Sequence, residues 1–195
     1  MIKVITFDLD DTLWAIAPVI EKANQRMLEW MNHHTPKFSQ AYNHQGIDQL
    51  RDEVVADNPH LQHDLSQIRV ALIQRGLSRC GYDTANTLAQ QAFNVYFAAR
   101  NDVELFAGVQ TQLSALKQKY QIGALTNGNA DLAQVCIDHL FDFYFNSAQL
   151  GVSKPHPDFF ARALEHTGLS AETFIHIGDH HGHAITAAPA PVRTV

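Results

Sequence analysis

Apolar side chains recur at helical spacing through much of the first hundred residues. Ile20, Ala23 and Met27 begin one such series, which continues to Trp30 or Met31. Three helix-breaking residues divide the segment into pieces: Pro36, Gly46 and Pro59. Two further series follow, at 65–72 and at 88–97, and the first of them predicts a helix that ends before Gly76 or Gly81. Residues 15–100 therefore predict an all-helical unit.

Short apolar runs surround this helical unit on both sides. Residues 4–7 predict a buried strand, and 120–125, 141–145 and 174–177 predict three more. Helical patterns lie between the later runs, at 109–119, 131–139 and 158–166. Strands that alternate with helices of about ten residues favour a parallel sheet. We therefore predict an α/β fold with a discontinuous core, 1–14 and 101–195, interrupted by the helical unit 15–100.

Composition excludes several classes of function. The chain has 195 residues, a formal net charge of −6 and no basic stripe, so nucleic acid is not an expected partner. No apolar run approaches the ~20 residues of a membrane span, and the chain begins in a strand rather than a signal peptide. Cys80 and Cys136 lack metal-ligand spacing, so two free thiols in a reducing cytoplasm are expected.

Two acids, Asp8 and Asp10, follow the first predicted strand directly. In open α/β sheets the carboxyl ends of the strands are where ligands bind. One carboxylate there can attack phosphorus, its neighbour can transfer a proton, and a hard divalent cation would reduce their mutual repulsion. An acidic turn after a strand explains the same residues, and Asp-x-Asp alone does not decide between the two.

Three later stretches carry similar double interpretations. Thr126 and Asn127 end a strand, where a hydroxyl and main-chain N–H groups can hold phosphate, although Asn-Gly is also a common turn. Lys154 precedes a proline at a predicted helix start and can supply a fixed positive charge, or it can be an ordinary surface lysine. Asp179 follows Gly178 at the end of the last strand, as a third acid or as part of a turn.

Together these four motifs resemble the haloacid dehalogenase (HAD) superfamily. The stretches are Asp-Leu-Asp-Asp-Thr-Leu from Asp8, Leu-Thr-Asn-Gly to Gly128, Gly-x-x-Lys-Pro-x-Pro from Gly151, and Gly-Asp at Asp179. They occur in the superfamily's order, and the helical unit lies where its helical C1-type cap lies. The resemblance covers nearly the whole chain. Within the superfamily, the sequence is also similar to a bacterial branch that contains phosphatases acting on FMN and on the ribityl-aminouracil phosphate of riboflavin synthesis.

The resemblance implies a Rossmann-like parallel sheet with a helical cap, and Mg²⁺-dependent hydrolysis of phosphomonoesters. Asp8 would form an aspartyl-phosphate, and Asp10 would protonate the leaving oxygen and then activate water. Thr126 and the N–H of Asn127 would hold the phosphate, and Lys154 would neutralise charge. The implied Mg²⁺ ligands are Asp8, the main-chain carbonyl of Asp10, and Asp179. A small phosphorylated substrate is expected, FMN or a riboflavin-pathway phosphate being candidates, for a cytoplasmic monomer or weak homodimer.

The sequence departs from the superfamily after Asp179. Members usually carry another acid four or five residues further on, but Ala184 lies there and no acid follows Asp179. Imidazole suits softer ions than Mg²⁺, so His180, His181 and His183 are interpreted as exposed loop residues. Residues 187–195 resemble the approach to a fifth strand, with Pro189 and Pro191 in place of a helix, so a shortened C-terminus is expected.

These departures keep a second function open. A catalytically impaired relative that binds a phosphorylated ligand or a protein would tolerate the missing acid. A haloalkanoic-acid dehalogenase is disfavoured, because those enzymes lack an acid equivalent to Asp10. The sequence therefore favours a phosphatase, and the cap side chains that would select its substrate show no signature.

Overall fold

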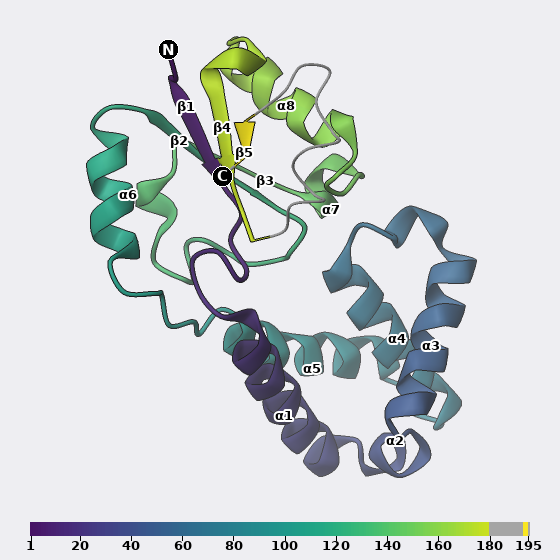
Figure 1. Cartoon of the computed structure of the whole chain (residues 1–195). Helices are drawn as coiled ribbons and strands as arrows, with labels where there is room; N and C mark the ends of the chain where they lie inside the picture. Colours follow the sequence, from purple (N-terminus) through teal and green to yellow (C-terminus); the bar gives the residue numbers. More distant parts are fainter. Residues whose placement is uncertain (180–192, 195) are drawn as a thin grey trace. The chain divides into compact units, whose positions relative to one another are not determined.

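The computed structural model of the chain describes residues 1–179 and 193–194 (Figure 1). The expectations for His180, His181, His183, Ala184, Pro189 and Pro191 fall outside these residues. Of the C-terminal stretch 187–195, residues 193–194 alone are described. The chain divides into two compact units: unit 1 is Met1–Ile16 with Val103–Val195, and unit 2 is Ala17–Asp102. Among the described residues, no helix combines the length and the apolar composition needed to cross a membrane.

Unit 1 is built on a parallel sheet of five strands in the order β3-β2-β1-β4-β5. The strands are β1 (Val4–Phe7), β2 (Gln121–Thr126), β3 (Phe143–Asn146), β4 (Phe174–Ile177) and β5 (Arg193–Thr194). All four residues of β1 are buried, because the strand pairs on both sides and both faces of a parallel sheet are covered. The predicted α/β class is confirmed.

Helices cover the two faces of this sheet. Figure 1 shows α6 (Val109–Lys117) and α8 (Pro157–Thr167) on opposite sides of it. Helix α8 buries Phe159, Phe160 and Ala163 in a cluster with residues of four strands, Phe174 of β4 among them. The described residues of the unit also form three short elements, α7 (Ser147–Leu150) and the 3₁₀ turns η2 (Asp138–Leu140) and η3 (Ala171–Thr173). The core of unit 1 thus lies between the sheet and its helices.

The helix predicted over residues 131–139 is wrong. This segment forms successive turns and only the short η2. The side chain of Asp131 accepts hydrogen bonds from the main-chain N–H groups of Ala133 and Gln134, and Cys136 has a positive φ of 63°. A residue in the left-handed conformation ends a right-handed helix, so the apolar residues of this segment are buried by a folded loop and not by a helix.

Cys80 and Cys136 are free thiols.

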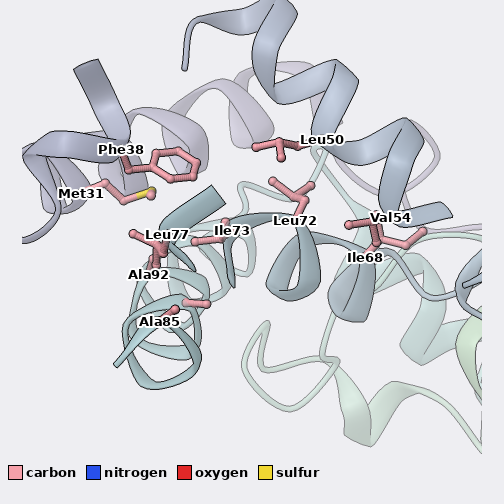
Figure 2. Close-up of a cluster of buried hydrophobic side chains, with 11 residues drawn as sticks. Met31, Phe38, Leu50, Val54, Ile68, Leu72, Ile73, Leu77, Ala85 and Ala92 are labelled. Atoms are coloured by element: carbon pink, nitrogen blue, oxygen red, sulfur yellow. The ribbon is translucent and has the colours of Figure 1, made fainter. Parts of the chain in front are cut away.

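Unit 2 is all helical, as predicted. Its elements are α1 (Ile16–His34), α2 (Pro36–Ala41), α3 (His44–Asp57), the 3₁₀ turn η1 (Pro59–Leu61), α4 (Leu65–Arg79) and α5 (Ala85–Arg100). Figure 2 shows its core, where Phe38, Leu50 and Leu77 pack together from three helices. Gly46 lies in the first turn of α3 and does not interrupt a helix. Helix α4 runs through Gly76 and ends before Gly81.

Candidate active site

The motifs meet at the carboxyl edge of the sheet. Asp8 directly follows β1, whose last residue, Phe7, lies in register with Ala124 of β2 and Ile177 of β4. The N–H of Asp8 continues the ladder by donating to the carbonyl of Ile177, at 2.8 Å. Thr126 ends β2 one strand away, and Asp179 lies two residues beyond β4. The sheet register therefore brings residues from distant parts of the sequence to one place.

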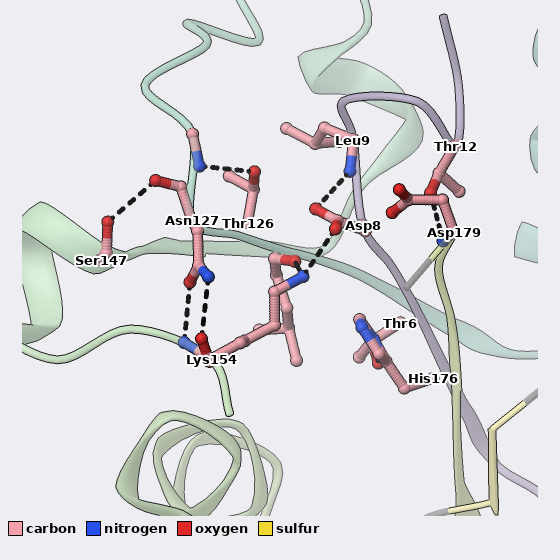
Figure 3. A network of polar contacts seen from close by, with 12 residues as sticks. Thr6, Asp8, Leu9, Thr12, Thr126, Asn127, Ser147, Lys154, His176 and Asp179 are labelled. Atoms are coloured by element: carbon pink, nitrogen blue, oxygen red, sulfur yellow. Dashed lines mark hydrogen bonds and ion pairs between the residues drawn. The ribbon is translucent and has the colours of Figure 1, made fainter. Parts of the chain in front are cut away.

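Lys154 and Asp8 form an ion pair at this edge (Figure 3). Lys154 Nζ lies 2.9 Å from Asp8 Oδ2, and their side chains are 1% and 14% exposed. The other oxygen, Oδ1, accepts a hydrogen bond from the N–H of Leu9 at 2.8 Å. Lys154 Nζ also donates to the carbonyl of Leu125, at 2.7 Å. Lys154 is therefore a buried, oriented cation and not a surface lysine.

The electrostatics of Lys154 involve all three acids of the motifs. Burial lowers the pKa of Lys154 below its ordinary value, although its ion pair with Asp8 and the charges of Asp179 and Asp10 act to raise it. A buried ammonium is costly unless carboxylates compensate it. The charge of Lys154 is therefore compensated by the acids of the motifs.

Asp10 is held by a residue that the sequence did not single out. Trp14 Nε1 donates to Asp10 Oδ1 at 3.0 Å, and Trp14 itself is fully buried. Between them the chain makes a tight turn, in which the N–H of Leu13 donates to the carbonyl of Leu9 and Asp11 has a φ of 57°. The turn and the indole together orient the Asp10 carboxylate. In the sequence, the signal for this contact is a tryptophan, which carries an indole N–H donor, four residues after an acid.

Thr126 and Asn127 form a polar turn at the end of β2. Thr126 is buried, and its Oγ1 accepts a hydrogen bond from the N–H of Gly128 at 2.9 Å. A hydroxyl that accepts in this way retains its own hydrogen to donate to a ligand. The side chain of Asn127 points toward Lys154 and bonds to its main chain (Figure 3).

The Gly178–Asp179 turn approaches Asp8 closely. A Cβ on Gly178 would lie 3.3 Å from the Cβ of Asp8, so glycine permits this contact. The N–H of Asp179 donates to Thr12 Oγ1 at 3.2 Å, which ties the last motif to the first. Sequence reasoning gave Thr12 no such role.

The donor set at this edge suits a hard cation. Asp8 and Asp179 offer carboxylate oxygens, and Asp10 offers a main-chain carbonyl, all of them oxygen ligands of the kind that Mg²⁺ prefers. Within residues 1–179 and 193–194, no group of three or more His, Cys, Asp or Glu side chains is placed to hold a metal. The chemistry of two carboxylates and a carbonyl suits Mg²⁺, and the placement of a metal among these three residues stays a prediction.

His176 is a buried histidine behind this edge. It lies on β4, and its Nδ1 is 3.0 Å from Thr6 Oγ1 on β1. Its ring and that of Phe160 from α8 form a T-shaped pair, with 5.4 Å between centroids. Burial lowers the pKa of His176 to about 3, and the charge of Lys154 acts in the same direction against the hydrogen bond to Thr6. His176 is therefore neutral at physiological pH.

Comparisons with known proteins agree with this geometry. The family model described as "Hydrolase: haloacid dehalogenase-like hydrolase" matches residues 2–190. The 5-amino-6-(5-phospho-D-ribitylamino)uracil phosphatase YigB of Escherichia coli (strain K12) is 27% identical over 180 residues, 91% of this chain and 75% of that protein. A glyceraldehyde 3-phosphate phosphatase of Pyrococcus abyssi is 30% identical over 188 residues, 92% of this chain and 74% of that protein.

A solved structure is also similar. A 2-haloacid dehalogenase from Pseudomonas syringae pv. Tomato DC3000 matches with a TM-score of 0.92 and 33% identity, over 96% of this chain and 82% of that one. The chain belongs to the haloacid dehalogenase-like hydrolase family. The predicted resemblance is thereby confirmed, and so is the class of enzyme, a phosphatase of this family.

Proposed function

We propose that this enzyme hydrolyses phosphomonoesters of small metabolites through an aspartyl-phosphate on Asp8. The observation that carries the proposal is the arrangement of Asp8, with one oxygen held by Lys154 Nζ at 2.9 Å and the other by the N–H of Leu9 at 2.8 Å. A carboxylate fixed in this way at a ligand-binding edge is oriented for attack on phosphorus.

Two acids divide the chemistry. The Asp8 carboxylate attacks phosphorus, and the bond from phosphorus to the leaving oxygen breaks while protonated Asp10 donates a proton to that oxygen. The Asp10 carboxylate then takes a proton from water, which attacks the aspartyl-phosphate and releases phosphate from Asp8. The indole of Trp14, 3.0 Å from Asp10 Oδ1, orients this acid for both transfers.

The remaining site residues hold the phosphoryl group. The Thr126 hydroxyl and the N–H of Asn127 donate to its oxygens, and the Lys154 ammonium offsets their charge as it develops. Asp8, Asp179 and the carbonyl of Asp10 are the residues that would hold Mg²⁺, which when bound would polarise the phosphoryl group. The absence of an acid after Asp179 predicts that Mg²⁺ is held weakly, since lost supporting groups cost ~10–100-fold.

A panel of substrates tests the proposal. Ribitylaminouracil phosphate and glyceraldehyde 3-phosphate, named for the two similar phosphatases, belong in it together with FMN and other small phosphomonoesters. We expect phosphate release that requires Mg²⁺ and saturates only at high Mg²⁺. No release from any ester, with or without Mg²⁺, would favour the catalytically impaired relative that binds a phosphorylated ligand or a protein.

The 33% identity to a 2-haloacid dehalogenase favours one other activity. The same panel therefore includes 2-chloropropionate, with chloride release as the readout. Asp10, oriented by Trp14, supplies the proton transfers that a phosphate ester needs, and this favours the phosphatase. Chloride release without phosphate release would reverse the assignment.

A further inference from the structure

The side chain of Asn127 makes a two-point contact with the main chain of Lys154. Asn127 Oδ1 accepts from the N–H of Lys154 at 2.7 Å, and Asn127 Nδ2 donates to the carbonyl of Lys154 at 2.9 Å (Figure 3). The two residues are 27 positions apart in the sequence. A primary amide is the side chain that carries one donor and one acceptor side by side, as a peptide unit needs.

Asn127 is itself fixed from two sides. Its own carbonyl accepts a hydrogen bond from Ser147 Oγ at 3.0 Å, and Ser147 is buried at the start of α7. It also follows Thr126 directly at the end of β2. The amide therefore projects from a backbone that the sheet and α7 both hold in place.

The other end of Lys154 returns to the same strand. Its Nζ donates to the carbonyl of Leu125, two residues before Asn127 on the chain, at 2.7 Å. The main chain of Lys154 is thus held by Asn127 and its ammonium by Leu125, which fixes a side chain that otherwise has many rotamers. The ammonium fixed in this way is the one that lies 2.9 Å from Asp8.

We infer that the Asn127 side chain is a positioning residue for Lys154: its amide holds the lysine main chain so that the ammonium stays at Asp8. This role is separate from phosphate binding by the N–H of Asn127, and its importance for catalysis rests on the proposed function. Displacement of a site group by about 1 Å can cost ~10²-fold in rate.

The first test measures the position of Lys154 without requiring activity. Acetic anhydride acetylates accessible amines, and mass spectrometry gives the rate at Lys154 relative to the exposed Lys119 of the same unit. We expect Lys154 to be strongly protected in the parent, because its side chain is 1% exposed. In Asn127→Ala we expect its relative rate to rise at least about 10-fold, since both hydrogen bonds are lost.

Asn127→Asp separates hydrogen bonding from packing. Aspartate has the same shape but cannot donate to the carbonyl of Lys154, so we expect faster labelling here too, by a smaller factor. This variant also decides the question if Asn127→Ala does not fold. Asn94→Asp, the same change at an exposed position of α5, is the matched control and should leave Lys154 protected. Parent-like protection of Lys154 in the folded Asn127 variants would overturn the inference.

The second test follows activity on a substrate that the parent hydrolyses. Asn127→Ala should lower kcat about 10–100-fold in the parent but less than about 2-fold in a Lys154→Met background, because a residue that acts through another has no effect once that one is removed. Equal fold-losses in both backgrounds would show an independent role for the amide. A protein without activity leaves the labelling result standing, so failure of the proposed function and failure of this inference are distinguishable.

Discussion

The two oxygens of the Asp8 carboxylate have different neighbours, and this difference is the basis of its proposed reactivity. Oδ2 lies 2.9 Å from Lys154 Nζ and Oδ1 lies 2.8 Å from the N–H of Leu9, so the carboxylate has one orientation. Each oxygen has more than one lone pair, so these contacts leave acceptor capacity for phosphorus or a cation. The geometry thus combines orientation with a remaining capacity to react.

Asp8→Asn is expected to abolish turnover in a protein that stays folded. An amide cannot form the acyl-phosphate, so we expect the rate to fall ~10³-fold or more in the phosphate-release assay. Asp11→Asn is the matched control, because Asp11 is exposed and its side chain accepts from the N–H of Ile16, which an amide oxygen can also do. Near-parental turnover in Asp8→Asn would show that another group is the nucleophile.

His176 should make stability depend on pH. Its pKa in the folded protein is lowered to about 3, against about 6.5 in the unfolded chain. Between these values the unfolded chain binds a proton that the folded protein does not, so the free energy of unfolding falls as pH falls from about 6.5. The stabilisation that comes from keeping His176 neutral is fully present above about pH 6.5 and is lost progressively toward pH 3.

We therefore expect His176→Gln to weaken the pH dependence by up to ~1.4 kcal/mol per pH unit in this window. Urea unfolding of parent and variant at several pH values between 4 and 7.5 gives the difference, in which other titrating groups cancel. His60→Gln, at an exposed histidine, should leave the pH dependence as in the parent. Parallel stability curves for parent and His176→Gln would contradict the expectation.

At the scale of elements, the sequence predicted those whose burial follows a simple period. Strands β1 to β4 are predictable because each is a short apolar run, and the prediction for β4, Phe174–Ile177, matches its bounds to the residue. Strand β5, Arg193–Thr194, is not an apolar run, and the pattern predicts only the approach to a strand there. The loop over 131–139 was mistaken for a helix because Leu132 and Ile137 are buried within turns, and a left-handed residue such as Cys136 leaves no mark in a hydrophobic pattern.

The candidate site was predictable to the same degree. The acids follow predicted strands and Lys154 precedes a predicted helix, so their positions in the sequence place them at the carboxyl edge of the sheet. The contacts of Asn127 with Lys154 and of Thr12 with Asp179 join residues far apart in sequence, and only the folded sheet brings them together. The sequence pattern identifies candidate site residues, but it does not show which of them form hydrogen bonds with one another.

Helix α4 offers a test of packing against helix propensity. In an exposed helix, Gly→Ala usually stabilises by ~0.5–1 kcal/mol. At Gly76, however, an added Cβ would lie 2.3 Å from Phe38 Cε2 and 3.0 Å from Leu50 Cδ1, and both side chains are buried. Overpacking of this kind costs ~1–3 kcal/mol, so we expect Gly76→Ala to lower the urea midpoint. Ser78→Ala, exposed on the same helix, should leave it unchanged or raise it, and a raised midpoint for Gly76→Ala would refute the clash.

At the scale of the whole molecule, the described hydrophobic clusters stay within units. The cluster around Leu77 belongs entirely to unit 2, and the cluster around Phe159 belongs entirely to unit 1. Each unit also contains one of the two tryptophans, Trp14 in unit 1 and Trp30 in unit 2. Fluorescence can therefore follow each unit separately.

We expect core substitutions to act on the unit that contains them. Leu77 is fully buried, so Leu77→Ala should cost ~2–5 kcal/mol. In a Trp14→Phe background the urea transition reported by Trp30 should shift, and in a Trp30→Phe background the transition reported by Trp14 should shift less. The reciprocal control, Phe159→Leu, should reverse this order. Equal shifts at both probes would mean that the units unfold as one cooperative body.

The central place of β1 in the sheet has a consequence for synthesis on the ribosome. Val4 pairs with Gln121 and Phe174, so the first strand emerges long before either neighbour exists. At 5–20 residues per second the wait is on the order of ten seconds, during which unit 2 is completed. Over that interval Val4–Phe7 is an unpaired apolar strand, a segment prone to intermolecular pairing. Asp8, Asp10 and Asp11 flank it with negative charge, which is the flanking pattern that suppresses such aggregation. Asp8 and Asp10, the two acids proposed for catalysis, would thus help to protect the nascent chain from aggregation before there is an active site.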